Sequence, residues 1–220
     1  MKISLREIYL LRHAETAANE EGVLQGRMDS PLSSRGVRQA QALAEVLVNL
    51  GVDAVYASPA GRVAATLTPA LQRGLPEPSV MAGLDEIDLG RVANLTYEEF
   101  HSQFLPRIDP EEYRRGEYRF PGGESRRDLF ERASAQVETI LALDWEKALV
   151  AAHGGILSHL LAALLGIPFD GWIRFRLDNA ALAKLVWYDD RPSLSFFNSC
   201  GHLPEELRSP PFPPLFPGRG

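Results

Sequence analysis

Apolar positions along this chain fall into short continuous runs, separated by longer stretches in which apolar residues recur every three to four positions. The short runs predict strands at residues 8–11, 52–57, 79–82, 148–152, 181–188 and 194–198, of which the first is expected to be buried. The periodic stretches predict amphipathic helices over residues 37–47, 63–71 and 130–141, each burying one face. This alternation predicts an α/β fold with a mostly parallel central sheet, in three α/β/α layers.

Cap residues indicate where several of these helices begin and end. Ser33 or Ser34 can cap the first helix, which we expect to stop at Gly51. Ser58 followed by Pro59 predicts the start of the second helix, with the serine as cap and the proline at the first helical position. The third helix, whose buried face lies within residues 130–141, is expected to span residues 124–143, and a fourth helix is expected over residues 154–166.

Two stretches do not show either periodicity. Residues 17–33 contain glycine and proline and form a loop longer than a simple connector, which makes it a candidate functional loop. Residues 83–123 mix acidic, aromatic and arginine side chains, and we expect them to form a helical insertion over the active site. We expect one domain over residues 1–208 and a loosely held proline-rich tail over residues 209–220.

The insertion holds aromatic residues and arginines whose roles can be read in two ways. The aromatic residues could line a pocket for a bulky alcohol, but such spacings more often form the insertion's own small core; they are Tyr97, Phe100, Phe104, Tyr113 and Phe120. The arginines could bind a second anionic group, although a solvated face is the expected role; they are Arg114, Arg115 and Arg119.

Composition and charge narrow the function classes. A chain of 220 residues with 45% hydrophobic and 24% charged residues can bury a core without disulfides or metal. A net charge of −6 works against nucleic acid as a partner, because that binding depends on neutralising phosphates. Only three of the 23 basic residues are lysines, so most cations are guanidinium groups, which suit bidentate contact with a small phosphate or carboxylate.

Targeting signals are not evident in the sequence. Arg6 and Glu7 interrupt the apolar stretch near the first residue, and no run reaches the roughly 20 apolar residues of a membrane span. The single cysteine, Cys200, cannot form an internal disulfide. We therefore expect a cytoplasmic protein without a membrane partner; its oligomeric state stays open, with a homodimer as one option.

Polar residues that carry chemistry follow three of the predicted strands. Arg12 and His13 follow the first, Arg62 lies one turn into the helix after the second, and His153 follows the fourth. Since the carboxyl ends of parallel strands meet at one edge of a sheet, these side chains should form a compact cationic pocket. Gly154 and Gly155 add backbone N–H groups at a helix N-terminus, and we expect the pocket to hold a phosphoryl group.

Each of these residues also has an ordinary structural role to consider. A single histidine at a strand end is usually a hydrogen-bonded structural residue, and Arg62 alone is typical of a solvated helix surface. Paired histidines could instead bind a metal ion. However, His153 and His159 lie about 240° apart around a helix axis and cannot chelate one ion together. No HExxH motif or cysteine cluster is present, so we expect neither a metal nor a cofactor.

The polar end of the first strand, Leu11-Arg12-His13-Ala14-Glu15-Thr16 with Asn19, resembles the signature of the histidine phosphatase superfamily, or phosphoglycerate-mutase-like family. Further blocks resemble the family in order: Pro31-Leu32-Ser33 with Gly36 and Gln39, Ala57-Ser58-Pro59 with Arg62 and Thr66, Leu84 to Gly90, Pro121 to Ser125, Val150 to Gly155, and Asn198 with His202 and Leu203. The last block is similar to that of the small phosphatase branch.

The resemblance implies a role for each matching residue. His13 would attack phosphorus and become phosphohistidine, and Glu86 would protonate the leaving oxygen; only the family pattern selects Glu86 over Asp85 and Asp88. The remaining implied contacts to the phosphoryl group or substrate come from His153, Arg12, Arg62, Asn19, Gln25, Gly26 and Gly154. The role of His202 is open.

The family resemblance leaves three functions to consider. A metal-independent phosphomonoesterase acting on a small phosphorylated metabolite is the leading hypothesis. A cofactor-dependent phosphoglycerate mutase is the alternative, although the stretch from Glu86 to His153 is shorter than in the mutases and Ala14 replaces their typical glycine. A phosphate-binding protein without turnover is disfavoured by the complete set of candidate catalytic groups.

Overall fold

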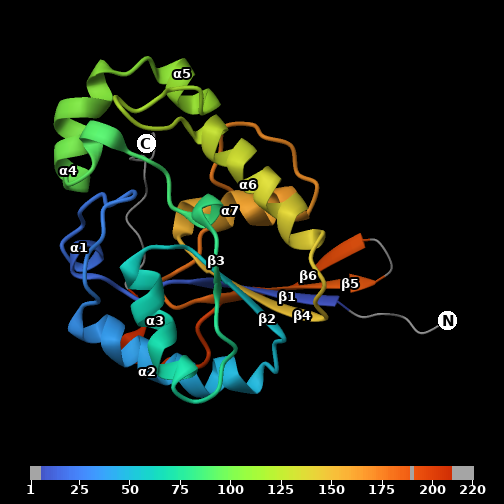
Figure 1. Cartoon of the computed structure of the whole chain (residues 1–220). Coiled ribbons are helices and arrows are strands. Elements are labelled where there is room, and N and C mark those ends of the chain that lie inside the picture. The colour runs from blue at the N-terminus through green and yellow to red at the C-terminus, as the bar shows by residue number, and fades with distance from the viewer. Residues whose placement is uncertain (1–5, 189–190, 210–220) are drawn as a thin grey trace.

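A six-stranded sheet forms the centre of the computed structural model, which describes residues 6–188 and 191–209 (Figure 1). The strands are β1 (Arg6–Arg12), β2 (Ala54–Ala57), β3 (Ser79–Val80), β4 (Lys147–Ala152), β5 (Leu182–Tyr188) and β6 (Arg191–Ser199), in the order β3-β2-β4-β1-β5-β6. The first four run parallel, while β5 and β6 are antiparallel to their neighbours. The predicted α/β fold with a mostly parallel sheet is confirmed.

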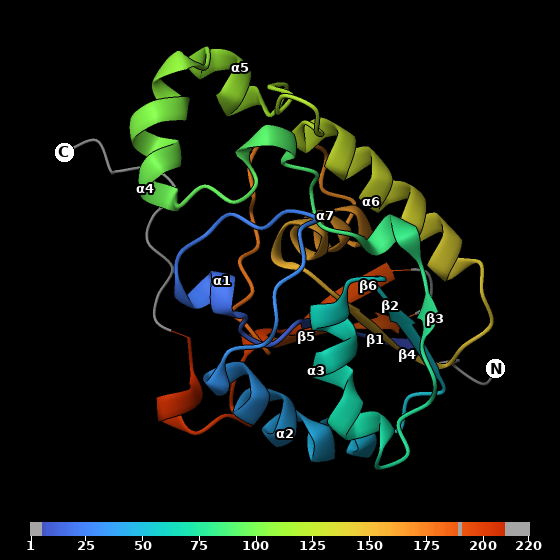
Figure 2. The same ribbon diagram turned by 60° about the vertical axis from the view of Figure 1, so that its left-hand side comes forward.

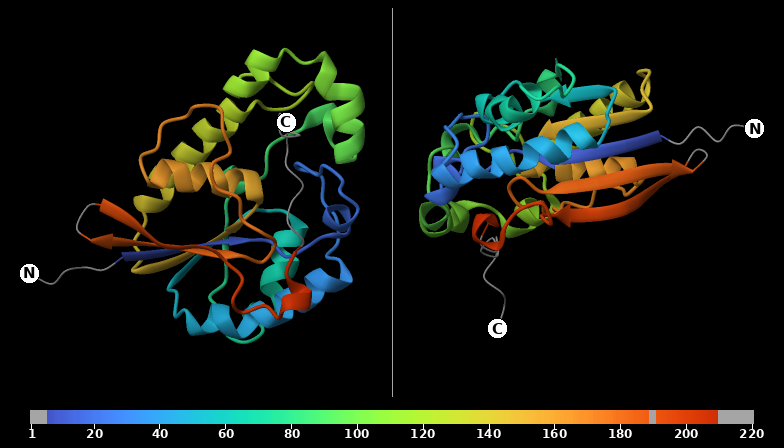
Figure 3. Two further views of the ribbon diagram at one scale, coloured as in Figure 1. Left: turned by 180° about the vertical axis from the view of Figure 1, so that it is seen from behind. Right: turned by 90° about the horizontal axis from the view of Figure 1, so that it is seen from below.

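Helices cover both faces of the sheet (Figures 1 and 3). Helices α6 (Arg126–Leu141) and α7 (Gly154–Leu164) pack on one face, and α2 (Ser34–Asn49) and α3 (Gly61–Leu71) pack on the other. Alternate residues of β1 enter the two cores: Ile8 and Leu10 one, Tyr9 and Leu11 the other. This two-sided burial explains why β1, β2 and β4 are continuous apolar runs, whereas β3 and much of β6 are exposed.

The strand register brings the chemistry-bearing strand ends together. Arg12 pairs with Ala152, and the N–H of His13 donates to the carbonyl of Ala152 at 3.0 Å. On the other side of β4, the N–H of Ser58 donates to the carbonyl of Ala151 at 3.0 Å. His13, His153 and the start of the β2–α3 connection therefore lie at one edge of the sheet, as the parallel arrangement predicts.

The insertion consists of short helical turns beyond this edge, seen in green around α4 and α5 in Figure 2. They are the 3-10 turns Ala82–Leu84, Gly90–Val92 and Leu105–Arg107, the π-helical turn Phe100–Phe104, and helices α4 (Tyr97–Glu99) and α5 (Pro110–Arg115). The insertion's own core contains Leu89, Val92, Phe100, Ile108 and Phe120. The expected small aromatic core is present for Phe100, Phe104, Tyr113 and Phe120, whereas Tyr97 lies outside it.

The predicted cap residue is confirmed for α2 but not for α3. Ser33 caps α2, accepting a hydrogen bond from the N–H of Gly36, and the helix ends at Asn49. The prediction for the second helix was wrong, because α3 begins at Gly61 with Ala60 in the cap position. The Ser58 hydroxyl accepts a hydrogen bond from the N–H of Ala60 at 3.3 Å, before the helix begins, and it also contacts His153 and Asp85.

Smaller elements complete the described part of the chain. The loop over residues 17–33 contains a short helix that was not predicted, α1 (Ala17–Glu20), and a 3-10 turn spans Glu205–Leu207 near the end. Within the described residues, no helix is long and apolar enough to cross a bilayer. The proposed tail falls almost entirely outside the described residues, and the domain boundary before it stays a prediction.

Close packing of α2 against the loop after His13 gives a test of this fold. An ideal Cβ on Gly36 would lie 1.9 Å from the carbonyl oxygen of Glu15. We expect Gly36→Ala to lower the free energy of unfolding by about 1–3 kcal/mol, because the backbone must move apart to admit the methyl group. Urea unfolding measures this change.

Gly201→Ala is the matched control, because the nearest atom to its Cβ would be the Ser199 hydroxyl at 4.0 Å. Equal stabilities of the two alanine variants would contradict the close approach of α2 to this loop.

Candidate active site

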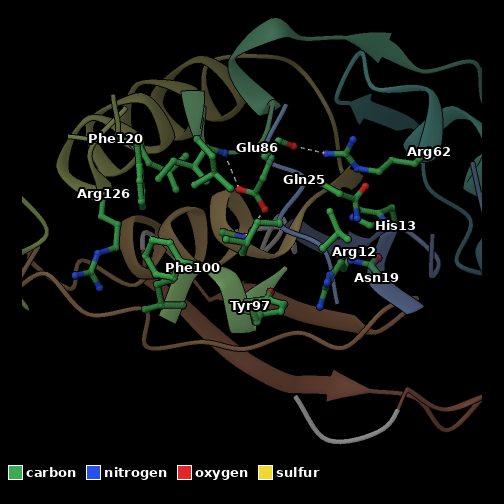
Figure 4. Close-up of a pocket in the computed structure, with 18 of the residues that line it drawn as sticks. Arg12, His13, Asn19, Gln25, Arg62, Glu86, Tyr97, Phe100, Phe120 and Arg126 are labelled. Carbon is green, nitrogen blue, oxygen red and sulfur yellow. Dashed lines mark hydrogen bonds between the residues drawn. The ribbon is translucent and has the colours of Figure 1, made fainter. Parts of the chain in front are cut away.

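A cavity of about 210 Å³ lies between the carboxyl ends of the parallel strands and the insertion (Figure 4). Among its walls are seven of the residues selected from the sequence: Arg12, His13, Asn19, Gln25, Gly26, Arg62 and Glu86. Gly154 lies beside it, lining a smaller cavity together with Arg12 and Glu86. His153 is fully buried, with its ring centroid 5.2 Å from that of His13. The structure therefore gathers every sequence-selected residue at one place.

The imidazole of His13 is held in one tautomer. Its Nδ1 lies 2.8 Å from the carbonyl oxygen of Ala14, which can only accept a hydrogen bond, so Nδ1 carries the proton and Nε2 has the lone pair. Burial lowers the pKa of His13 well below its usual range, and the nearby Arg12 and Arg62 cations lower it further. His13 is consequently a neutral base with an available lone pair at neutral pH.

His153 is the opposite tautomer. The Nε–H of Arg62 donates to Nδ1 of His153 at 3.1 Å, so a neutral His153 carries its proton on Nε2. That nitrogen lies 2.7 Å from the hydroxyl of Ser58, which donates in turn to Asp85 at 3.0 Å. Burial, followed by the proximity of His13 and Arg62, lowers the pKa of His153 well below its usual range. Both ring nitrogens thus bond to protein groups, and a contact with a phosphoryl oxygen requires exchange of one of these bonds.

Arg62 is a buried organising residue rather than a solvated one, with 2% of its surface exposed. Besides its bond to His153, its guanidinium donates to the carbonyl oxygens of Gly26 at 2.8 Å and Met28 at 2.7 Å. It also donates to the carboxylate of Asp29 at 3.2 Å. The sequence assigned this cation to the phosphoryl group, but in the structure most of its donors hold the loop that contains Gly26.

The other predicted binding residues are held by short-range hydrogen bonds. Arg12 donates to the carbonyl oxygen of Leu177 at 2.7 Å, and Gln25 donates to the hydroxyl of Thr16 at 2.7 Å. The side-chain oxygen of Asn19 accepts a hydrogen bond from Asn179 at 3.1 Å. These contacts orient polar groups along the cavity wall before any ligand binds.

Gly26 has a backbone requirement that explains the glycine. Its φ is +54°, and an ideal Cβ would lie 2.7 Å from the carbonyl oxygen of Ile87. A side chain at this position would therefore push the loop away from the segment that carries Glu86.

Glu86 occupies the N-terminus of α7, which corrects one expectation from the sequence. Its carboxylate accepts hydrogen bonds from the N–H groups of Gly155 at 2.8 Å, Ile156 at 3.1 Å and Ile87 at 2.9 Å. An ideal Cβ on Gly155 would lie 2.5 Å from the Glu86 oxygen. Glu86 therefore fills the space over Gly155, where the sequence suggested a phosphoryl group.

The structure separates Glu86 from its two acidic neighbours. Asp85 accepts a hydrogen bond from Ser58, and Asp88 pairs with Arg27 at 3.6 Å. Of the three carboxylates only Glu86 lines the cavity, in agreement with the family pattern.

Several residues that sequence reasoning missed position this site. Arg132 on α6 donates to the backbone carbonyls of Gly83, Asp85 and Glu86, and it pairs with Glu124 at 2.8 Å. In the sequence Arg132 is one more arginine on a helix. Only the packing of α6 against the insertion reveals that it holds the Glu86 segment in place.

A second missed group lies behind His13. The carbonyl oxygen of His13 accepts hydrogen bonds from the Asn179 side chain and from the N–H of Ala180, both at 3.1 Å. Ala180 has a φ of +60°, and its own carbonyl accepts a hydrogen bond from Nε2 of His202 at 3.0 Å. This places His202, whose role was open, behind the site as a support for Ala180.

Among residues 6–188 and 191–209, no group of three or more histidine, cysteine or acidic side chains is arranged to hold a metal ion. Metal independence stays a prediction for experiment.

Comparison with known proteins agrees with this geometry. The family model described as the histidine phosphatase superfamily (branch 1) matches residues 8–199. A protein of Proteus mirabilis named "Probable phosphoglycerate mutase GpmB" is 34% identical over 196 residues, covering 86% of this chain and 88% of the relative. A protein of the same name from Salmonella paratyphi B is 30% identical over 193 residues, covering 84% and 86%.

Two similar solved structures are named as a hydrolase and as a phosphatase. A protein named "Mycobacterial hydrolase 1" has a TM-score of 0.79 and 28% identity, covering 89% of this chain and 99% of that chain. A mycobacterial glucosyl-3-phosphoglycerate phosphatase in complex with VO3 has a TM-score of 0.77 and 28% identity, covering 88% and 99%.

The buried histidines make stability depend on pH. The folded-state pKa is well below the usual 6.5 for His13 and His153, and about 4 for His159. In the unfolded chain these groups take up protons near pH 6.5, so acidification favours unfolding. We expect the free energy of unfolding to fall between pH 7.5 and 5.5 by about 1 kcal/mol for each buried histidine, measured by urea unfolding.

His159→Phe tests one histidine away from the cavity, since its ring packs against Phe130 and Phe169. In this variant the decrease in the free energy of unfolding between pH 7.5 and 5.5 should be about one third smaller than in the wild type, because one of three buried histidines is removed. A free energy of unfolding that stays constant or rises over this interval would show that the histidines are not buried in neutral form.

Proposed function

Because the chain belongs to the histidine phosphatase superfamily (branch 1), we propose that it is a phosphomonoesterase that works through a phosphohistidine at His13. One observation carries the proposal: His13 is buried, neutral and tied at Nδ1, and it lines the same cavity as Arg12 and Arg62. A neutral imidazole with a defined lone pair, next to two cations, suits attack on a phosphate monoester.

In the first step, the Nε2 lone pair of His13 attacks phosphorus and forms the N–P bond while the P–O bond to the alcohol breaks. Arg12 and Arg62 balance the charge of the phosphoryl oxygens, so the step needs no metal ion for electrostatic stabilisation. Phosphoryl transfer depends mainly on positioning and charge, and the hydrogen bonds of Asn19 and Gln25 support this positioning.

Glu86 is proposed as the acid that gives a proton to the leaving alkoxide and as the base that takes one from water in the second step. Water then attacks the phosphohistidine, breaks the N–P bond and releases inorganic phosphate. The N–H groups of Gly155 and Ile156 hold the carboxyl group at the cavity wall, where leaving alcohol and incoming water both pass.

A phosphoglycerate mutase is the second candidate, because relatives at 30–34% identity carry that name. A mutase must exclude water from the phosphohistidine long enough to return the phosphoryl group. We favour the phosphatase, acting in the cytoplasm on a small phosphorylated metabolite, because similar solved structures include a phosphatase and because the insertion is short.

The nucleophile assignment leads to a direct test. His13→Ala should lower the rate of p-nitrophenyl phosphate hydrolysis by at least about 10³-fold, because the covalent intermediate cannot form. Activity of the unmodified enzyme should resist EDTA and be inhibited by vanadate. Acid-labile ³²P labelling of the protein, measured after rapid quenching, should disappear in the variant.

His159→Phe provides the control, since it removes another buried histidine outside the cavity. Hydrolysis that survives His13→Ala would reject His13 as nucleophile. Conversion of 3-phosphoglycerate to 2-phosphoglycerate that exceeds hydrolysis and depends on bisphosphoglycerate would establish the mutase instead.

The acid role of Glu86 predicts a dependence on the leaving group. Glu86→Gln should lower kcat/KM for an alkyl phosphate by about 10²–10⁴-fold, and for p-nitrophenyl phosphate by much less, because nitrophenolate leaves without a proton. Measuring both substrates on one preparation corrects for any loss of folded enzyme. Equal losses on the two substrates would assign Glu86 to binding or positioning rather than proton transfer.

A further inference from the structure

The end of the cavity away from His13 is apolar. We call it the apolar subsite and define it by Ile87, Leu89, Phe100, Phe120, Leu129 and Ile173. Figure 4 shows Phe100 and Phe120 at the opposite end of the cavity from His13, with Glu86 between them. Since Glu86 lies where the proposed leaving oxygen departs, the apolar subsite is the place for the alcohol portion of the substrate.

These side chains do more than fill the insertion's core. Leu89, Phe100 and Phe120 belong to that core and still present surface to the cavity. Ile173, from the connection between α7 and β5, lines the cavity while only partly buried and packs in none of the hydrophobic clusters. An apolar side chain placed in this way gains its burial from a ligand.

Among the described residues that line the cavity, Arg126 is the cation at this end (Figure 4). It is the first residue of α6, where the helix dipole disfavours positive charge. Its guanidinium donates to the carbonyl oxygen of Tyr113 and lies 4.8 Å from the centre of the Tyr113 ring. Burial lowers its pKa, which means that its charge is poorly solvated.

Neighbouring arginines differ from Arg126 in their partners. Arg127 pairs with Glu117, Arg119 with Asp128, and Arg114 with Glu111. Within the described residues, no carboxylate lies within 4.0 Å of Arg126. A partly buried guanidinium without an anionic partner is costly unless a ligand supplies one, and a carboxylate fits its planar fork.

We propose that the substrate is a phosphate monoester whose alcohol portion is a compact apolar group, the size of one ring, carrying a carboxylate at the end remote from the phosphate. The phosphate binds beside His13, the apolar body lies on the apolar subsite, and the carboxylate pairs with Arg126. This inference rests on the proposed phosphatase function and adds the class of alcohol. Glycerol phosphates and phosphoglycerates lack the apolar body and leave the apolar walls without a partner.

Phosphate esters of three alcohols separate the contributions of the apolar subsite and of Arg126 to kcat/KM. We expect kcat/KM to be at least about tenfold higher for benzyl phosphate than for glycerol 1-phosphate, because the ring is buried against the apolar subsite. It should rise by about a further tenfold for 4-carboxybenzyl phosphate, because of the pairing with Arg126. Wild-type ratios near one in either comparison would overturn the proposal.

Two arginine variants form a matched pair on adjacent positions of α6. Arg126→Met should reduce the 4-carboxybenzyl to benzyl ratio to about one, whereas Arg127→Met, outside the cavity, should keep it. Ile173→Asn should lower the benzyl to glycerol ratio severalfold. Each ratio compares two substrates on one preparation, so it does not depend on the fraction of the protein that is folded. If the 4-carboxybenzyl to benzyl ratio is unchanged in Arg126→Met, Arg126 is excluded as the carboxylate partner.

A binding measurement separates this inference from the proposed function. The phosphonate analogue of 4-carboxybenzyl phosphate cannot be hydrolysed, and calorimetric titration should show about tenfold weaker binding to Arg126→Met than to the wild type. If no phosphate ester is hydrolysed, the proposed phosphatase function is rejected. The titration would still show whether Arg126 binds the carboxylate of the ligand. Active enzyme with equal phosphonate affinities in both proteins would reject the subsite alone.

Discussion

The buried guanidinium of Arg62 is the interaction on which the site depends most. It joins the carbonyl groups of the loop at Gly26 and Met28 to Nδ1 of His153, and it does so with almost no exposure to water. Each of these bonds would leave a buried polar group unsatisfied if it were broken. Arg62 therefore fixes the loop wall of the cavity, the tautomer of His153 and one of the positive charges near His13 at the same time.

Two buried arginine cations beside two histidines set the electrostatics of the site. Burial and these cations lower the pKa of His13 and His153, so the histidines are neutral and the arginines carry the charge. The division suits a nucleophile, which needs a lone pair, and an oxyanion site, which needs charge. The Glu86 carboxyl group lies nearby at the N-terminus of α7, where backbone N–H groups hold it in place.

The cavity joins two surfaces of different character. Its polar end is built on strand ends of the sheet, while its apolar end is built from the insertion, α6 and the connection before β5. Such a division lets a phosphate site stay constant while the surrounding segments select the alcohol. Here these segments provide aromatic and aliphatic walls and one guanidinium, Arg126, and the proposed class of alcohol rests on these groups.

The sequence by itself determined the α/β class, the strands that end in Arg12, His13 and His153, and the likeness to a phosphatase family, because continuous apolar runs and ordered motifs are local patterns. Tertiary structure decided the contacts. Ser58 bonds to His153 instead of capping α3, and Glu86 instead of a phosphoryl group fills the N-terminus of α7. Nor does local sequence distinguish Arg126 from Arg127, because only packing decides which of them faces the cavity and which finds a carboxylate.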